Sequence, residues 1–141
     1  MAYFRTGVGS GVKAKVIGYT GKITITKGVE HSITLDEPLS NYKYIFMAAD
    51  FRYVSGTYGL FNVVKTGDIV DAFGTLNHTG GIYCFSSVDH IKNNSITTYG
   101  NNTNNTINGT FRYIDNNTIG YTSNTNYATG SNSELIVIGF N

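Results

Sequence analysis

The apolar residues of this chain recur with a period of two residues, in short runs separated by polar stretches. In the segment 22–27, Ile23 and Ile25 alternate with lysine and threonine, which predicts a strand with one apolar face. The segment 32–36 repeats this alternation. No stretch of ten or more residues keeps the 3.6-residue period of an amphipathic helix. The pattern therefore predicts a protein built from strands, with essentially no helix.

The segment 42–53 differs from the others because both of its faces are apolar through the middle. Such a pattern is typical of a strand that is covered on both sides. In a two-layer sandwich only one face meets the core, so the second cover has to be a loop or another subunit. The aromatic residues of this segment are therefore candidates for an oligomer interface: Tyr42, Tyr44, Phe46, Phe51 and Tyr53.

Nearly the same phrase occurs at 93–96, 104–107 and 116–119: two asparagines, then serine or threonine, then isoleucine. Asparagine tolerates a positive φ and hydrogen-bonds its own backbone, so each pair predicts a turn. The β-branched residues that follow predict the start of a strand. Turns spaced every 11–12 residues are the pattern of an all-β meander or sandwich. Thr20-Gly21 also predicts a tight hairpin between the segments on either side of it.

These signals predict one all-β domain, an antiparallel β-sandwich or jelly-roll-like fold of about nine to eleven short strands with little or no helix. A chain of 141 residues can bury a core without a metal or a disulfide. Residues 1–12 carry three glycines and are expected to form a flexible N-terminal attachment arm, while residues 13–141 form the domain. Further strands are predicted at 13–19, 61–65, 69–73, 82–86, 95–99, 110–115, 118–122 and 134–140.

Charge and cysteine content narrow the range of partners. The net charge is +1, and the lysines and arginines are scattered, whereas a nucleic-acid-binding protein carries a basic stripe. We therefore expect no nucleic-acid partner.

Cys84 is the only cysteine and sits in an apolar run, which predicts a small buried side chain. We expect no membrane insertion, because no apolar run approaches about 18 residues. Synthesis in a cytoplasm is expected too, since the N-terminus lacks the apolar core of a secretory signal.

The sequence predicts no catalytic, cofactor or metal site. The glycine-rich segment 7–13 has the spacing of neither a dinucleotide-binding nor a phosphate-binding loop. His31, His78 and His90 share no metal-type spacing with one another, with the cysteine or with a carboxylate pair. Most acidic residues lie at turn-like steps, where turn formation accounts for them. We therefore expect a protein that is not an enzyme.

The aromatic residues point to binding rather than to catalysis. The chain has 11 tyrosines, 8 phenylalanines and no tryptophan. Tyrosine offers a flat apolar face and a hydroxyl group, which suit both protein interfaces and sugar rings. Four tyrosines lie among asparagine, threonine and serine and form the candidate glycan site: Tyr99, Tyr113, Tyr121 and Tyr127. The alternative interpretation is that they pack across strands as ordinary sheet pairs.

Two segments give the chain a resemblance to a known class of proteins. One is the opening of the long apolar strand, Leu39-Ser40-Asn41-Tyr42-Lys43-Tyr44-Ile45-Phe46, and the other is the C-terminal close, Leu135-Ile136-Val137-Ile138-Gly139-Phe140-Asn141. In outline this order resembles the tip modules of bacteriophage tail fibres and receptor-binding proteins, over residues 21–141. Those modules have a Leu-x-Asn-Tyr-type opening, short strands with glycine turns and an Ile-x-Ile-Tyr-Gly-like close. Here Ile138 stands where their close has an aromatic residue.

The resemblance implies a non-enzymatic β-sandwich head on a virion, commonly a homotrimer, with host surface glycans as candidate ligands. The arm would attach it to another virion protein through the candidate residues Tyr3, Phe4 and Arg5. Two alternatives stay open at this point. The first is a capsid decoration or head-fibre protein held by the same arm, and the second is a stand-alone carbohydrate-binding module.

Overall fold

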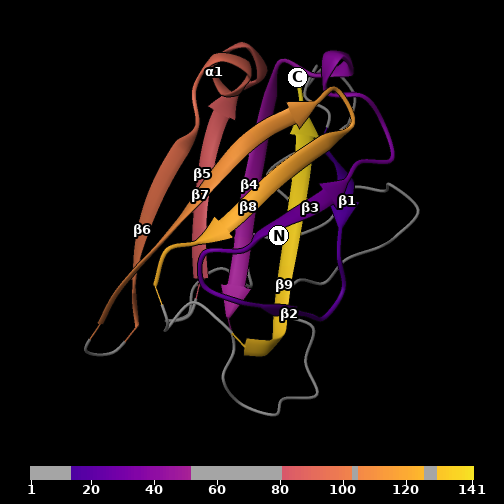
Figure 1. Cartoon of the computed structure of the whole chain (residues 1–141). Coiled ribbons are helices and arrows are strands. Elements are labelled where there is room, and N and C mark those ends of the chain that lie inside the picture. The colour runs from indigo at the N-terminus through magenta and orange to yellow at the C-terminus, as the bar shows by residue number, and fades with distance from the viewer. Residues whose placement is uncertain (1–13, 52–80, 103–104, 126–129) are drawn as a thin grey trace.

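The structure is a computed structural model that describes residues 14–51, 81–102, 105–125 and 130–141 (Figure 1). The attachment arm expected at 1–12 lies outside these ranges, as do the strands expected at 61–65 and 69–73. Within the described residues the chain forms nine strands in two antiparallel sheets that pack as a sandwich, with one short α-helix. The predicted all-β sandwich is therefore confirmed.

The two sheets divide the strands as follows. Sheet A has the order β1-β9-β4-β5, with β2 also paired to β9. Its strands are β1 (Ala14–Tyr19), β2 (Ile23–Ile25), β4 (Tyr44–Phe51), β5 (Gly81–Ser87) and β9 (Gly130–Phe140). Sheet B has the order β3-β8-β7-β6. Its strands are β3 (Glu30–Thr34), β6 (Ile96–Asn102), β7 (Asn105–Asp115) and β8 (Thr118–Ser123). Figure 1 shows sheet B lying across sheet A.

The hairpin expected at Thr20-Gly21 is wrong, because β1 and β2 do not pair with each other. Both pair with β9, and they follow one another along it. Thr20 bridges the break: its N–H donates to the Leu135 carbonyl at 3.1 Å, and its Oγ1 accepts from the Leu135 N–H at 3.0 Å. Gly21 then changes the direction of the chain with φ +68°. An apolar central strand such as β9 needs partners along both of its edges, and this demand outweighs the local turn signal.

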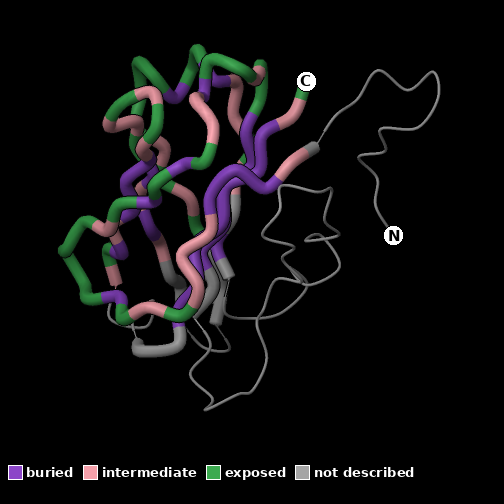
Figure 2. Tube along the Cα trace, turned by 90° about the vertical axis from the view of Figure 1, so that its right-hand side faces the viewer, coloured by how far each residue is buried: buried purple, intermediate pink, exposed green. Residues whose placement is uncertain are grey.

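Alternate residues of the two sheets meet to form the core. Sheet A contributes from its central strands Ile45, Met47, Leu135 and Val137, and sheet B contributes Ile33, Phe111, Ile119 and Tyr121. The Phe111 and Tyr121 rings lie 4.7 Å apart between centroids. In Figure 2 buried positions run along the strands in the middle of the molecule, whereas exposed ones gather on turns and outer strands. This is the arrangement that period-two alternation predicts.

Both faces of β4 are buried within the single chain. Ile45 and Met47 face the core, and the residues between and after them, Phe46 and Ala48, are also fully buried, on the opposite face of sheet A. The strand is paired on both edges as well, to β5 and to β9. The predicted two-sided cover of this strand is therefore confirmed, and it arises without a second subunit.

One short helix departs from the pure strand pattern. α1 (Val88–Asn93) begins at Ser87, whose side chain accepts a hydrogen bond from the His90 N–H at 3.1 Å. Val88 and Ile91 are buried beneath it. These two lie three positions apart, which is helical spacing, but a six-residue helix is too short to reveal a period in the sequence. A 3₁₀ turn, η1 (Leu39–Asn41), precedes β4. No helix among the described residues is long and apolar enough to cross a membrane.

Candidate functional site: an aromatic patch and a neighbouring pocket

A group of aromatic rings lies on the outer face of sheet A, where β4 begins and β5 and β9 end. We call Tyr44, Phe85 and Phe140 the aromatic patch; they come from β4, β5 and β9. The Tyr44 and Phe140 rings stack at 5.7 Å between centroids, and Phe85 meets Phe140 edge to face at 5.9 Å. The fully buried Phe46 ring lies against Phe85 at 4.8 Å. Strand register assembles the patch, because Tyr44 pairs with Phe140 and Phe46 pairs with Phe85.

The aromatic patch exposes a large apolar surface to solvent. Phe85 is 55% exposed and Tyr44 is 46% exposed. The rings hold one another in place, since an aromatic pair contributes about 0.5–1.5 kcal/mol beyond its buried area. A contiguous group of exposed apolar rings is typical of a surface that contacts another protein, whereas isolated exposed apolar residues are common everywhere.

A pocket of about 450 Å³ opens beside the patch, and the two share Tyr44. It lies where η1, the start of β4 and α1 meet. The side chains that line it are mostly polar or charged: Ser40, Tyr42, Lys43, Tyr44, Ser87, Val88, Asp89 and Lys92. A volume of this size is within the range of small-molecule binding pockets.

Backbone hydrogen bonds fix the walls of the pocket. The Val88 N–H donates to the Lys43 carbonyl at 2.8 Å, which ties α1 to the start of β4. The Lys43 N–H in turn donates to Oδ1 of Asn141 at 2.9 Å. On the other wall the Leu39 N–H donates to the Asn116 carbonyl at 2.8 Å. Segments from four distant parts of the sequence therefore hold the pocket in one shape.

Tyr42 forms part of the pocket wall and is itself held firmly. Its hydroxyl donates to Glu37 Oε2 at 3.1 Å. Burial, and then the bond to Glu37 and the charge of that residue, raise the pKa of Tyr42 to about 12. Lys15 lies 2.7 Å from the same carboxylate, and its hydrogen bond is the main cause that lowers the pKa of Glu37. These contacts leave Tyr42 as a fixed wall rather than as a mobile side chain.

The four tyrosines of the predicted glycan site do not gather on one surface. Tyr121 is fully buried in the core, where burial raises the pKa of its hydroxyl. Tyr113 is half-buried and packs against the core from the inner face of sheet B. Tyr99 is 68% exposed, and Tyr127 lies outside the described residues. The alternation of β7 and β8 turns two of the four inward, so Tyr121 offers no ring face to a ligand.

The surface around Tyr99 is nevertheless rich in hydroxyl groups. Thr97, Thr110 and Thr122 occupy matching positions on three neighbouring strands of sheet B. The hydroxyl oxygens of Thr97 and Thr110 are 2.9 Å apart, and the Asn124 amide donates to Thr110 Oγ1 at 3.0 Å. This row lies on the outer face of sheet B, away from the aromatic patch.

The predicted oligomer interface is only partly exposed. Of its five residues, Tyr44 is exposed, Tyr42 packs against the core, and Phe46 is buried. The side chain of Phe51 and all of Tyr53 lie outside what the structure describes, and so do Tyr3, Phe4 and Arg5 of the arm. Sequence reasoning missed Phe85 and Phe140. The signal that could have found them is their place on the same alternating face as Tyr44 once the strands are paired.

Titratable side chains form no metal-type or nucleophilic cluster in the part of the chain that the structure describes. No group of three or more histidine, cysteine, aspartate or glutamate side chains there is placed to hold a metal ion. Cys84 is partly buried against the core, as its apolar setting predicted. Burial raises the pKa of its thiol to about 12, so the thiolate is scarce at neutral pH.

Comparison with known proteins identified no relative of the chain. No family model, curated protein or solved structure matched the chain.

Proposed function

We propose that this chain is a non-enzymatic structural protein of a bacteriophage virion, the surface-exposed β module of a short tail fibre or receptor-binding tip. The observation that carries the proposal is the aromatic patch, because two exposed rings, Tyr44 and Phe85, packed around the half-buried Phe140 make a surface suited to contact with another protein. In this proposal the patch joins copies of the chain, most simply as a trimer. Residues 1–12 attach the module to another virion protein.

The position of the two resembling segments supports this proposal. The strand that follows the Leu39–Asn41 turn and the C-terminal strand lie side by side, since β4 pairs with β9 from Tyr44 opposite Phe140 to Phe51 opposite Ser133. The Asn141 side chain extends this pairing by accepting from the Lys43 N–H. The two segments that carry the resemblance therefore form one structural unit at the centre of sheet A, and the patch lies at its end.

Contact with a host glycan is the second part of the proposal. Hydroxyl-rich ligands need both donors and acceptors, which the threonine row beside Tyr99 supplies. The polar pocket beside the aromatic patch supplies them as well. A stand-alone carbohydrate-binding module would use the same surfaces, and it differs from this proposal in binding glycans without a virion partner.

Electron microscopy of intact particles tests the proposal directly. Gold-labelled antibodies against the purified domain are applied to particles of the phage that encodes the chain. Label at the tail tip is the expected result. Label spread over the capsid replaces the fibre-tip proposal with capsid decoration, which shares the fold and differs in the attachment partner. Particles that carry the chain nowhere overturn the virion proposal altogether.

A further inference from the structure

Three charged side chains line the pocket beside the aromatic patch, although the chain as a whole has few charged residues. Lys43, Lys92 and Asp89 line it together, and all three are exposed. No ion pair joins any of the three to another side chain in the described ranges. Two ammonium groups and one carboxylate leave the pocket with one positive charge, which favours a ligand with a single negative charge.

We propose that this pocket binds an acidic saccharide unit, a hydroxylated sugar ring that carries one carboxylate, as in the uronic acids. The proposal deepens the receptor contact proposed above and rests on it for its biological meaning. The binding itself depends only on the residues of the pocket.

The two serines of the pocket present hydroxyl protons to a ligand. Ser87 Oγ accepts from the His90 N–H at 3.1 Å, and Ser40 Oγ accepts from the Asn116 amide at 3.1 Å. A hydroxyl group that accepts in this way still has its own proton to donate. The Ser86 hydroxyl, by contrast, donates to the Ser87 carbonyl at 2.7 Å. Two lining hydroxyl groups, each with a proton to donate, suit the ring hydroxyls of a sugar.

Tyr44 supplies an apolar wall beside these polar groups. Its ring stacks on Phe140, which fixes its orientation, and it lines both the patch and the pocket. A flat aromatic ring next to hydrogen-bonding groups matches a sugar, whose ring has apolar C–H faces and a polar edge. A simple inorganic anion has no such apolar face.

Contacts hold one cation of the pocket and the backbone of the other. The Lys92 ammonium lies 6.0 Å from the centroid of the Tyr113 ring, within reach of a cation–π attraction. Lys43 is bonded through its backbone at both its N–H and its carbonyl, and its side chain is exposed. A ligand therefore meets a preformed backbone, and the ordering cost of binding falls mainly on the Lys43 side chain.

The same residues disfavour two simpler ligands. A phosphate group carries up to two negative charges, and Asp89 would repel it in the confined volume. A neutral sugar would satisfy the hydroxyl groups but would leave the one excess positive charge of the pocket unbalanced. The combination of Lys43, Lys92 and Asp89 with hydroxyl donors therefore selects for a sugar that carries a single acid.

Titration of the whole chain with glucuronic acid tests the proposal, with glucose and inorganic phosphate as the comparison ligands. Binding is followed by the shift of amide signals in two-dimensional NMR spectra. Glucuronic acid should bind at least about tenfold more tightly than either comparison ligand, because each charge-assisted contact is worth about a factor of ten. The double substitution Lys43→Gln/Lys92→Gln should abolish that preference.

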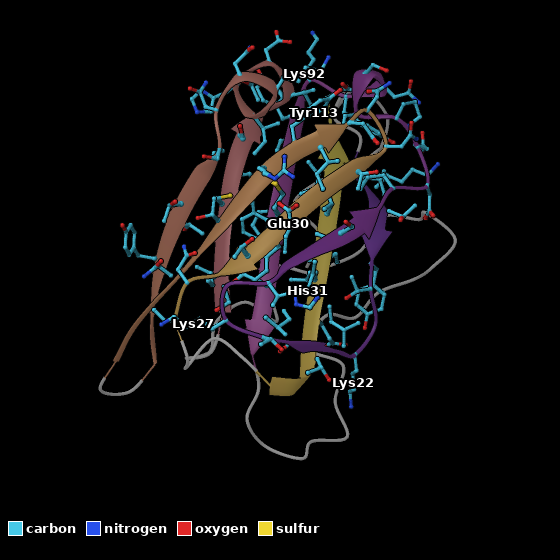
Figure 3. All side chains as sticks on the ribbon, in the orientation of Figure 1. Lys22, Lys27, Glu30, His31, Lys92 and Tyr113 are labelled. Atoms are coloured by element: carbon cyan, nitrogen blue, oxygen red, sulfur yellow. The ribbon has the colours of Figure 1, made fainter. Side chains whose placement is uncertain are left out.

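The matched control removes two lysines elsewhere. Lys22 and Lys27 are exposed and lie at the opposite end of the sandwich from Lys92, as Figure 3 shows. Lys22→Gln/Lys27→Gln lowers the net charge equally and should leave the preference intact. Tyr99→Ala tests in the same way whether the ligand binds instead at the threonine row on sheet B.

Three outcomes would overturn the proposal. One is equal binding of glucuronic acid and glucose, and another is binding of phosphate as tight as that of glucuronic acid. The third is loss of glucuronic acid binding in Tyr99→Ala but not in Lys43→Gln/Lys92→Gln, which would move the site to sheet B. All of these are solution results on the isolated chain. Failure here is therefore distinguishable from failure of the virion proposal, which microscopy decides.

Discussion

Tyr42 is held at the rim of the sandwich by contacts from several directions. Its ring occupies the space above Gly139, where a Cβ atom would lie 2.7 Å from the ring carbons. Its hydroxyl donates to Glu37, whose charge Lys15 balances. Glycine at position 139 therefore provides the room that a tyrosine just before the neighbouring strand fills. This close contact explains why the closing strand has a residue without a side chain there.

We expect Tyr42 to make the stability of the protein fall at alkaline pH. Its pKa is raised from an ordinary 10 to about 12, by burial first and then by Glu37. Between these values the folded state keeps a proton that the unfolded chain has lost, so a rise in pH favours unfolding. The contribution of Tyr42 is complete below pH 10 and declines as the pH rises toward 12.

The measurement is urea unfolding at a series of pH values from neutral to above 10. In Tyr42→Phe the alkaline loss of stability should be smaller than in the native chain, because the titrating group is gone. Tyr99→Phe, at an exposed tyrosine, serves as the control and should behave like the native chain. Equal alkaline slopes in the native chain and in Tyr42→Phe would contradict the prediction.

At the scale of elements, the path of β1 and β2 along β9 is the least regular feature of sheet A. At the break between β1 and β2 there is no regular strand pairing with β9. Thr20 is bound there to Leu135 by one backbone and one side-chain hydrogen bond. Its hydroxyl also donates to the Gly21 carbonyl at 2.8 Å. A single threonine thus joins two short strands into one continuous edge for β9.

Substitution of Thr20 by valine should destabilise the fold by about 1–3 kcal/mol, because the buried Leu135 N–H would lose its acceptor. Thr20→Ser keeps the hydroxyl oxygen and should recover most of that loss. Chemical denaturation followed by circular dichroism gives both free energies of unfolding. If valine proved as stable as threonine at this position, the bridging role would be ruled out.

At the scale of the whole molecule, the aromatic patch is the feature most suited to assembly. It lies at the side of sheet A where β5 is the outermost strand in the described order. This strand, Gly81–Ser87, has no charged residue in its sequence and exposes the Phe85 ring, while β6 lies along its outer side. Association of copies would cover the rings of the patch.

We expect the chain to form a trimer that depends on Phe85. Phe85→Ser should raise the dissociation constant by at least about tenfold, because an aromatic residue at the centre of an interface is typically worth about 2 kcal/mol or more. Tyr99→Ser removes a similarly exposed ring from sheet B and should leave association unchanged. Sedimentation velocity at micromolar concentration measures both. A native chain that sediments as a monomer would refute the prediction.

The sequence by itself determined where most of the described strands lie and which residues of the most regular ones face the core. Ile23 and Ile25 occur in β2, and Ile33 and Leu35 belong to the core, as alternation predicts. The burial of both faces of β4, with Phe46 and Ala48 on the outer one, also followed from the composition of the segment 42–53. These properties depend on neighbours one or two residues away, so a local pattern is sufficient to specify them.

Only the tertiary structure decided which strands pair and which side chains meet across them. Thr20 bonds to a residue 115 positions away, and this contact rather than the adjacent turn places β2. Phe85 and Phe140 join Tyr44 because β4 takes β5 and β9 as its two neighbours. The buried Tyr121 and the pocket around Lys43 have the same origin. Each strand edge could pair with many others, and the pairing that forms is the one that buries the whole core. A local sequence pattern therefore cannot specify it.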